Sequence, residues 1–164
     1  MTMTSSICSA AASDAGLNAD RLGALVTVAR QAADAGGAEL MRHYGRLSSV
    51  ESKGRIGDLV TNADVAAERV VLEVLGRETP DIAVLAEESG AAGEQDGLRW
   101  CVDPLDGTTN FTHGYPFFAT SIGLTFRQRP ILGAIAVPFL GETYWGAPGH
   151  GAHCNDSKIQ VSPC

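Results

Sequence analysis

The residues of this sequence with the clearest chemical potential lie in the segment Trp-Cys-Val-Asp-Pro-Leu-Asp-Gly-Thr-Thr-Asn-Phe, at positions 100–111. Its two acids, Asp103 and Asp106, are three positions apart, and Gly107 and Thr108 follow directly. Carboxylate oxygens bind hard divalent cations, whereas free backbone amides at a helix start bind anions. The segment therefore combines a cation-binding and an anion-binding group, and a metal-bridged phosphate would satisfy both.

Two further acidic motifs precede this segment. Glu87 and Glu88 follow the apolar run Ile-Ala-Val-Leu-Ala, and Asp64 ends the sequence Thr-Asn-Ala-Asp that begins at Thr61. Oxygen ligands without clustered Cys or His favour Mg²⁺ over Zn²⁺. Two like charges ~4 Å apart repel by roughly 4 kcal/mol near a surface, so a phosphate needs the cations to approach. The motifs together predict Mg²⁺-dependent hydrolysis of a phosphate ester by water.

Taken singly, each of these residues also has a purely structural interpretation. Asp103-Pro104 and Asp106-Gly107 are common turn dipeptides, and Asp64 fits a capping box at a helix start. The other polar residues suit solvated surface or loop positions: Lys53, Glu87, Glu88 and His113. The conjunction of acidic groups at element ends with a Gly-Thr pair is what favours a functional site.

Two helices are predicted in the first half of the chain. Apolar residues recur at three- and four-residue steps over residues 20–44, with Asp20 as the expected cap. The Gly36-Gly37 pair weakens that prediction in its middle. A second helix is expected over about residues 62–77, closed by Pro80.

The later sequence predicts short strands that are mostly sequential, with a final hairpin over residues 153–162. The strand leading into Asp103 is expected to stop at Pro104, which cannot donate a ladder hydrogen bond. Thr108 and Thr109 are the expected caps of a short helix. We therefore expect an α+β fold in which two helices pack on a largely antiparallel sheet, with the trailing acids at one end of that sheet.

The composition excludes several classes of function. A chain of 164 residues, 45% of them hydrophobic, suits one domain with a real core. The net charge of -7 argues against nucleic acid and anionic membrane surfaces as partners, and we expect no membrane span. Four cysteines without a Cys-x-x-Cys pair favour a reducing, cytoplasmic compartment. Residues 1–19, small, polar and without Lys or Arg, are expected to be a disordered tail before a domain at 20–164.

Four segments, taken together, resemble the inositol monophosphatase family of Mg²⁺-dependent, lithium-sensitive phosphatases. They are Asp-Leu-Val-Thr-Asn-Ala-Asp at 58–64, Glu-Glu-Ser at 87–89, the run at 100–123 and the Gly-Ala-x-Cys-Asn tail at 151–162. The first three match the family's N-terminal motifs in order and spacing. The resemblance implies the N-terminal part of a layered αβαβα sandwich, usually a homodimer, acting on a small phosphorylated polyol.

The resemblance also implies a set of metal ligands. Glu87, Asp103 and the backbone carbonyl of Leu105 would bind a first Mg²⁺. Asp103 would bridge to a second ion that Asp106 also binds.

Roles in phosphate binding and in catalysis follow from the same resemblance. Gly107 and Thr108 would hold the phosphate, which also lies near the metal-binding residues Glu87, Leu105 and Asp106. Thr108, with Asp64 or Glu87, would orient the attacking water. Lys53 and Glu88 match positions around the site.

One departure from the family's pattern affects these expectations. The family's second half carries a Trp-Asp-x-Ala-Ala-Gly motif, which does not occur in this sequence up to Cys164. The acids that follow Asp106 are Glu142 and Asp156, and neither lies in such a motif. The resemblance then implies an incomplete second metal site and missing specificity residues. We expect the N-terminal portion of a longer enzyme or the product of a shortened gene.

Three alternatives stay open at this point. A haloacid-dehalogenase-type phosphatase has a similar Asp-x-Asp-Gly-Thr motif, but its acids are two positions apart. A truncated, non-catalytic relative would bind metal or phosphate, or dimerise, without turnover. A close relative acting on histidinol phosphate would use the same residues.

Overall fold

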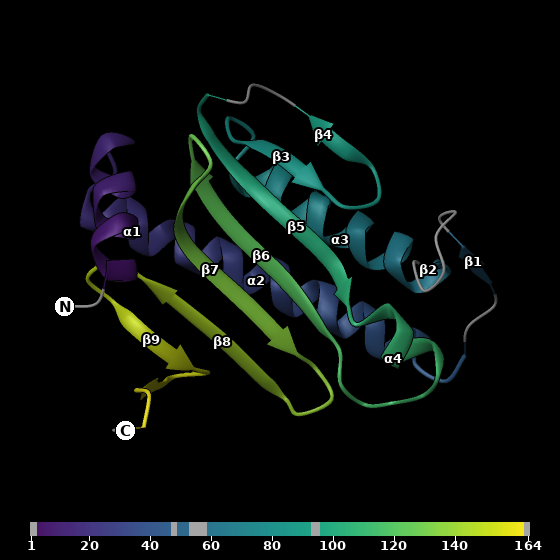
Figure 1. Ribbon diagram of the computed structural model, residues 1–164. Helices are drawn as coiled ribbons and strands as arrows, with labels where there is room; N and C mark the ends of the chain where they lie inside the picture. Colours follow the sequence, from purple (N-terminus) through teal and green to yellow (C-terminus); the bar gives the residue numbers. More distant parts are fainter. Residues whose placement is uncertain (1–2, 47–48, 53–58, 93–95, 163–164) are drawn as a thin grey trace.

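The computed structural model of the chain describes residues 3–46, 49–52, 59–92 and 96–162, and Figure 1 shows their arrangement. The helices are α1 (Met3–Asp14), α2 (Ala19–His43), α3 (Asn62–Glu78) and α4 (Thr108–Thr112). The strands are β1 (Val50–Ser52), β2 (Leu59–Thr61), β3 (Ala83–Ala86), β4 (Gly90–Ala92), β5 (Leu98–Asp106), β6 (Ala119–Phe126), β7 (Arg129–Val137), β8 (Glu142–Ala147), β9 (Gly151–Cys154) and β10 (Ser157–Ile159).

The described strands form one large sheet and a small ribbon. The large sheet has eight strands in the order β10-β9-β8-β7-β6-β5-β3-β4, and β1 pairs with β2 separately. Neighbours are antiparallel except β3 and β5, which run parallel. The predicted α+β class with a largely antiparallel sheet is confirmed, as is the final hairpin β9-β10.

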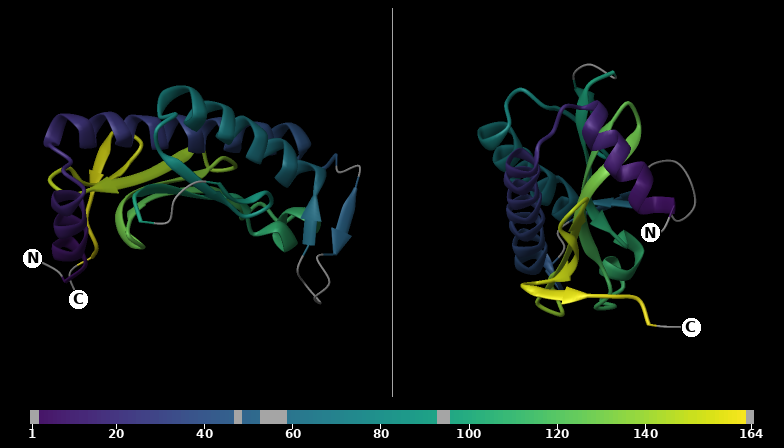
Figure 2. Two further views of the ribbon diagram at one scale, coloured as in Figure 1. Left: turned by 90° about the horizontal axis from the view of Figure 1, so that it is seen from above. Right: turned by 90° about the vertical axis from the view of Figure 1, so that its left-hand side faces the viewer.

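The helices divide between the two faces of this sheet. Figure 2 shows α2 and α3 side by side on one face, with α1 on the other face, where it packs against β7. Trp100, Ile122 and Leu124 are buried in the core, where the Trp100 ring nitrogen donates to Thr79 Oγ1 at 3.0 Å. Because side chains alternate along a strand, Cys101, Asp103 and Ser121 lie on the opposite face. Among the described residues, no helix has the length and apolar character needed to cross a membrane.

Helix α2 confirms the first predicted helix but not its cap. The cap is Asn18, whose side chain accepts a hydrogen bond from the Arg21 amide at 2.8 Å, so the expectation of Asp20 is wrong. The helix also continues through Gly36. A Cβ atom there would lie 2.7 Å from Thr120 Cγ2, so the glycine permits close packing of α2 on β6 instead of breaking the helix.

The N-terminal segment differs from the disordered tail that the sequence led us to expect. Met3–Asp14 form helix α1, in which Ala11 and Ala12 are buried. Asp14 also pairs with Arg129 of β7 at 2.6 Å. Small side chains let this helix lie close to the sheet, a tertiary contact that local composition does not reveal.

Strand β5 does not stop at Pro104 as predicted. It continues to Asp106, with a register shift against β6 between Asp103 and Asp106. Within this irregular stretch the carbonyl of Pro104 accepts a hydrogen bond from the buried Thr120 hydroxyl at 3.0 Å. A side-chain donor thus satisfies the Pro104 carbonyl, and the two acids are carried on a bulged strand end.

Candidate functional site

Two of the predicted site acids meet because β3 and β5 are parallel neighbours. Ala86 pairs with Val102, and the amide of Glu87 donates to the carbonyl of Val102 at 3.1 Å. Glu87 therefore follows β3 at the level where Asp103 continues β5. The carboxyl ends of parallel strands meet at one edge of a sheet, and here each of them carries an acid.

Asp103 is held in an environment that favours its protonated form. Burial, the charge of Glu87, a hydrogen bond with the Glu87 side chain and the charge of Asp106 together raise the pKa of Asp103 to about 7, against a backbone hydrogen bond from Leu105. Its Oδ1 atom is buried without a hydrogen-bond partner. Crowded carboxylates with an unsatisfied buried oxygen suit a hard cation, which would replace the shared proton.

Asp64 joins the start of α3 to the start of α4. It is 1% exposed, and its Oδ2 atom accepts from the Thr61 amide at 2.8 Å in the predicted capping box. The Thr108 hydroxyl lies 3.3 Å from Asp64 Oδ1 and 3.0 Å from the Leu105 carbonyl. Burial raises the pKa of Asp64, although hydrogen bonds from Thr61 and Thr108 oppose that shift. The cap residue is thus also in contact with the predicted phosphate-binding segment.

Gly107, not Thr108 or Thr109, occupies the cap position of α4, so the predicted caps are wrong. Its φ of 90° lies in the left-handed region, and no side chain caps the helix. A Cβ atom at this position would lie 3.1 Å from the Phe117 carbonyl oxygen. A glycine is therefore required for the turn that takes the chain from Asp106 to Thr108.

Two hollows adjoin these residues. One, of about 590 Å³, is lined by Glu87, Asp103, Ser121 and neighbouring residues on the face of the sheet opposite α2 and α3. The other, of about 250 Å³, is lined in part by Asp106 and Gly107. Space for a small ligand therefore exists next to the acids and next to the glycine turn.

The site residues are brought together only in part. Within the described ranges, no three His, Cys, Asp or Glu side chains are arranged to hold a metal ion between them. Asp106 influences Asp103 through its charge, but its own side chain is exposed. Lys53 lies outside the described residues. His113 lies 2.8 Å from the Thr109 carbonyl at the exposed end of α4, as the structural interpretation expects.

One residue of this region was missed by the sequence analysis. Glu68 is buried in α3 one turn after Asp64, and its Oε2 atom accepts a hydrogen bond from the Glu88 amide at 2.9 Å. The spacing of four residues from Asp64 placed it on the same helix face, which was the available signal.

The fold and these contacts define an α+β protein with an oxygen-rich site at the end of a mixed sheet, a site suited to cations. Comparison with known proteins names the group: the sequence model of the inositol monophosphatase family matches residues 22–164. The chain belongs to the inositol monophosphatase family. The resemblance drawn from the motifs is confirmed, and the haloacid-dehalogenase-type alternative is excluded.

Individual relatives support this assignment. The chain is 46% identical over 136 residues to an inositol-1-monophosphatase of Synechocystis sp., covering 82% of this chain and 47% of that protein. It is 42% identical to a fructose-1,6-bisphosphatase/inositol-1-monophosphatase of Aquifex aeolicus, covering 82% and 51%. The structure of the suhB protein of Bartonella henselae matches with a TM-score of 0.79 at 40% identity, covering 85% of this chain and 55% of that one. The chain thus spans about half the length of the relatives it matches.

Proposed function

We propose that this chain carries the metal- and phosphate-binding site of a Mg²⁺-dependent phosphomonoesterase that hydrolyses inositol monophosphate or a similar small phosphate monoester. The observation that supports it most is Asp103, which faces Glu87 with a buried, unpartnered oxygen. The names of the relatives from Synechocystis and Aquifex support a small phosphorylated polyol as the substrate.

The proposed ligands are oxygen atoms of the two adjoining strand ends. Glu87, Asp103 and the Leu105 carbonyl would hold the first Mg²⁺, and Asp103 and Asp106 the second. When bound, Mg²⁺ supplies positive charge that offsets the carboxylates and the phosphate, and it makes water more acidic. Because Glu87 and Asp103 share a hydrogen bond, Asp103 must lose its proton before it can act as a ligand, so binding should release protons near neutral pH.

The proposed phosphate contacts come from the glycine turn. The backbone of Gly107 and Thr108 would bind phosphate oxygens, with Asp106 and Leu105 alongside. If the Thr108 hydroxyl donates a hydrogen bond to Asp64, its lone pairs are free to accept a hydrogen bond from water. Thr108 and Asp64 would orient the attacking water in this way, and Glu87 would assist from the adjoining end of β3.

The test is Mg²⁺-dependent release of inorganic phosphate from inositol 1-phosphate. We expect Asp103→Asn to lower the rate at least about 100-fold, because it removes the charged ligand shared by both ions. Asp81→Asn, at a side chain that is 70% exposed and paired with Arg21, is the matched control and should leave the rate unchanged. Equal rates for the wild type and Asp103→Asn would contradict the proposal.

Two alternatives remain within the family. One is a protein that binds metal and phosphate without turnover. Calorimetry that shows Mg²⁺ and phosphate binding without turnover would favour it. Activity on histidinol phosphate that exceeds activity on inositol 1-phosphate would favour the histidinol-phosphate alternative.

We propose a cytoplasmic homodimer as the working form of the protein. Cys8, Cys101 and Cys154 are free thiols among the described residues, which is in keeping with a reducing compartment. Exposed aromatic side chains near α4 support self-association.

A further inference from the structure

Glu68 is the buried acid of α3 whose purpose the proposed mechanism does not explain. It is 6% exposed and lies among the apolar helix positions Ala67, Val71 and Leu75, which are fully buried. A carboxylate in such surroundings is unfavourable unless it is compensated by hydrogen bonds or charge. An apolar side chain would suit packing better, so the carboxylate has to be explained by what it binds.

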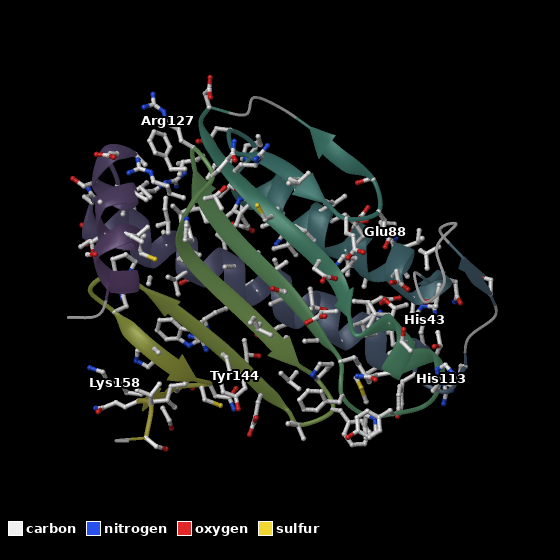
Figure 3. All side chains as sticks on the ribbon, in the orientation of Figure 1. His43, Glu88, His113, Arg127, Tyr144 and Lys158 are labelled. Carbon is white, nitrogen blue, oxygen red and sulfur yellow. The ribbon has the colours of Figure 1, made fainter. Side chains whose placement is uncertain are left out.

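Glu68 forms a hydrogen bond with the turn that follows β3. Glu68 Oε2 accepts a hydrogen bond from the backbone amide of Glu88 at 2.9 Å. Figure 3 labels Glu88 at this turn, between the end of β3 and α3. A hydrogen bond from an amide to a charged carboxylate is stronger than one between neutral groups, which offsets part of the cost of burial.

Together with a second hydrogen bond, this contact fixes the backbone on both sides of Glu87. The amide that precedes the Glu87 Cα atom donates to the Val102 carbonyl at 3.1 Å, next to Asp103. The amide that follows that Cα atom donates to Glu68. One bond ties Glu87 to β5 and the other ties it to α3, so the direction of the Glu87 side chain toward Asp103 is set by both.

We propose that Glu68 is a positioning residue that aims the Glu87 carboxylate at Asp103 by holding the Glu88 amide. The inference rests on the proposed function, in which Glu87 and Asp103 share a cation. Glu68 acts through backbone geometry and not through its charge on the site. Outer residues that orient metal ligands commonly change metal affinity by about 10–100-fold when they are removed.

Two substitutions separate geometry from charge. Glu68→Gln removes the charge but keeps a carbonyl oxygen that can accept from the Glu88 amide. Glu68→Met keeps a similar volume but removes the acceptor. Glu73→Met, on the exposed face of the same helix, is the matched control for the loss of an acid.

The first readout needs no metal. Hydrogen exchange of the Glu88 amide, followed by NMR in metal-free protein, should be at least about tenfold faster in Glu68→Met than in wild type. Glu68→Gln and Glu73→Met should stay close to wild type. An unchanged Glu88 amide in Glu68→Met would overturn the inference.

The second readout is Mn²⁺ affinity, measured by electron paramagnetic resonance of the free ion. We expect Glu68→Met to raise the Mn²⁺ Kd by about tenfold or more and Glu68→Gln by less than about threefold. Wild-type affinity in Glu68→Met, or an equal loss in both variants, would overturn it. Absence of Mn²⁺ binding by the wild type would instead refute the proposed metal site, while the amide exchange still decides whether Glu68 holds the turn.

Discussion

At the scale of single residues, the central feature is a carboxyl group that is easier to protonate than usual. Asp103 is partly buried and faces Glu87, with Asp106 nearby, and these neighbours raise its pKa to about 7. The same arrangement that disfavours its negative charge favours a cation. Proton and cation therefore compete for one position, which gives the site a characteristic pH dependence.

This competition predicts how stability changes with pH in the absence of metal. The pKa of Asp103 is about 7 in the folded state against 3.8 as the ordinary value, so the folded state holds the proton more tightly. Its contribution to stability is present at low pH and is lost as the pH rises from about 4 to about 7. The side chain in Asp103→Asn cannot ionise, so this variant should not lose stability in the same way as the pH rises.

The measurement is the Tm of metal-free wild type and Asp103→Asn between pH 5 and pH 8. The Tm of the variant should rise relative to wild type across this range, by roughly 2–4 °C, a modest value because the group is partly solvated. Addition of Mg²⁺ at pH 8 should raise the Tm of wild type but not of the variant. A Tm difference between the variant and the wild type that stays constant with pH would contradict the raised pKa of Asp103.

The sequence singled out candidate site residues more readily than the side chains that support them. Asp64, Glu87, Asp103 and Thr108 are candidates because each stands at the end of a recognisable motif or apolar run. Glu68 was missed because its partner is a backbone amide 20 positions away, which no local pattern records.

At the scale of elements, the close approach of α2 to β6 explains how the helix layer meets the site strands. Thr120 packs against Gly36 on one side, and its hydroxyl holds the Pro104 carbonyl. The helix contact and the bulge that carries Asp103 and Asp106 thus depend on one buried threonine.

Gly36→Ala should therefore destabilise the protein. Its Cβ atom would lie 2.7 Å from Thr120 Cγ2 and 2.9 Å from Val71 Cγ2, both of them in the core, so the side chains must shift. We expect a loss of about 1–3 kcal/mol in the free energy of unfolding, measured in urea. Gly76→Ala in α3 is the control, because no atom lies within 4 Å of its Cβ.

The two glycine substitutions should have different effects on the free energy of unfolding. Gly76→Ala should be neutral or stabilising by up to about 1 kcal/mol, since alanine favours a helix. If both substitutions had the same effect, the packing role assigned to Gly36 would be wrong.

Periodicity predicted α2 and α3, each of which buries one face, and β-rich runs between turn residues predicted the succession of strands from β5 to β10. It failed where tertiary contact overrides local preference. Helix α1 is stabilised by contact with the sheet, and β5 continues past Pro104 through a register shift in which the Thr120 hydroxyl donates to the Pro104 carbonyl. The cap at Asn18 shows that the position of a helix end is less predictable than the helix itself.

At the scale of the whole molecule, the two faces of the sheet are unequally covered. Helices α2 and α3 cover one face, whereas α1 reaches the other face only near one end, and none of the described helices lies in front of β5 in Figure 1. The matched relatives are about twice as long as this chain. The phosphatase activity of those longer relatives is therefore a proposal for this chain.

An apolar surface near α4 gives a prediction about assembly. Tyr115, Phe117 and Phe139 are 59%, 63% and 46% exposed, and Tyr44 links them, since its ring contacts Phe139 and its hydroxyl donates to the Gly114 carbonyl. Surfaces of this kind mark association sites. Phe117→Asp should weaken self-association at least about tenfold in sedimentation velocity, with less than about 0.5 kcal/mol change in the free energy of unfolding.

Ile7→Asp, at a side chain 45% exposed on α1, is the control for this surface and should leave association unchanged. Identical sedimentation profiles for wild type and Phe117→Asp would show that the aromatic surface does not mediate assembly.

The measurement that tests the account most directly is calorimetric titration of Mg²⁺ into the wild type and into Asp103→Asn near pH 7. We predict saturable binding to the wild type with release of protons, visible as a dependence of the heat on the buffer, and binding weakened at least about tenfold in the variant. Mg²⁺ isotherms that are the same for both proteins would contradict it.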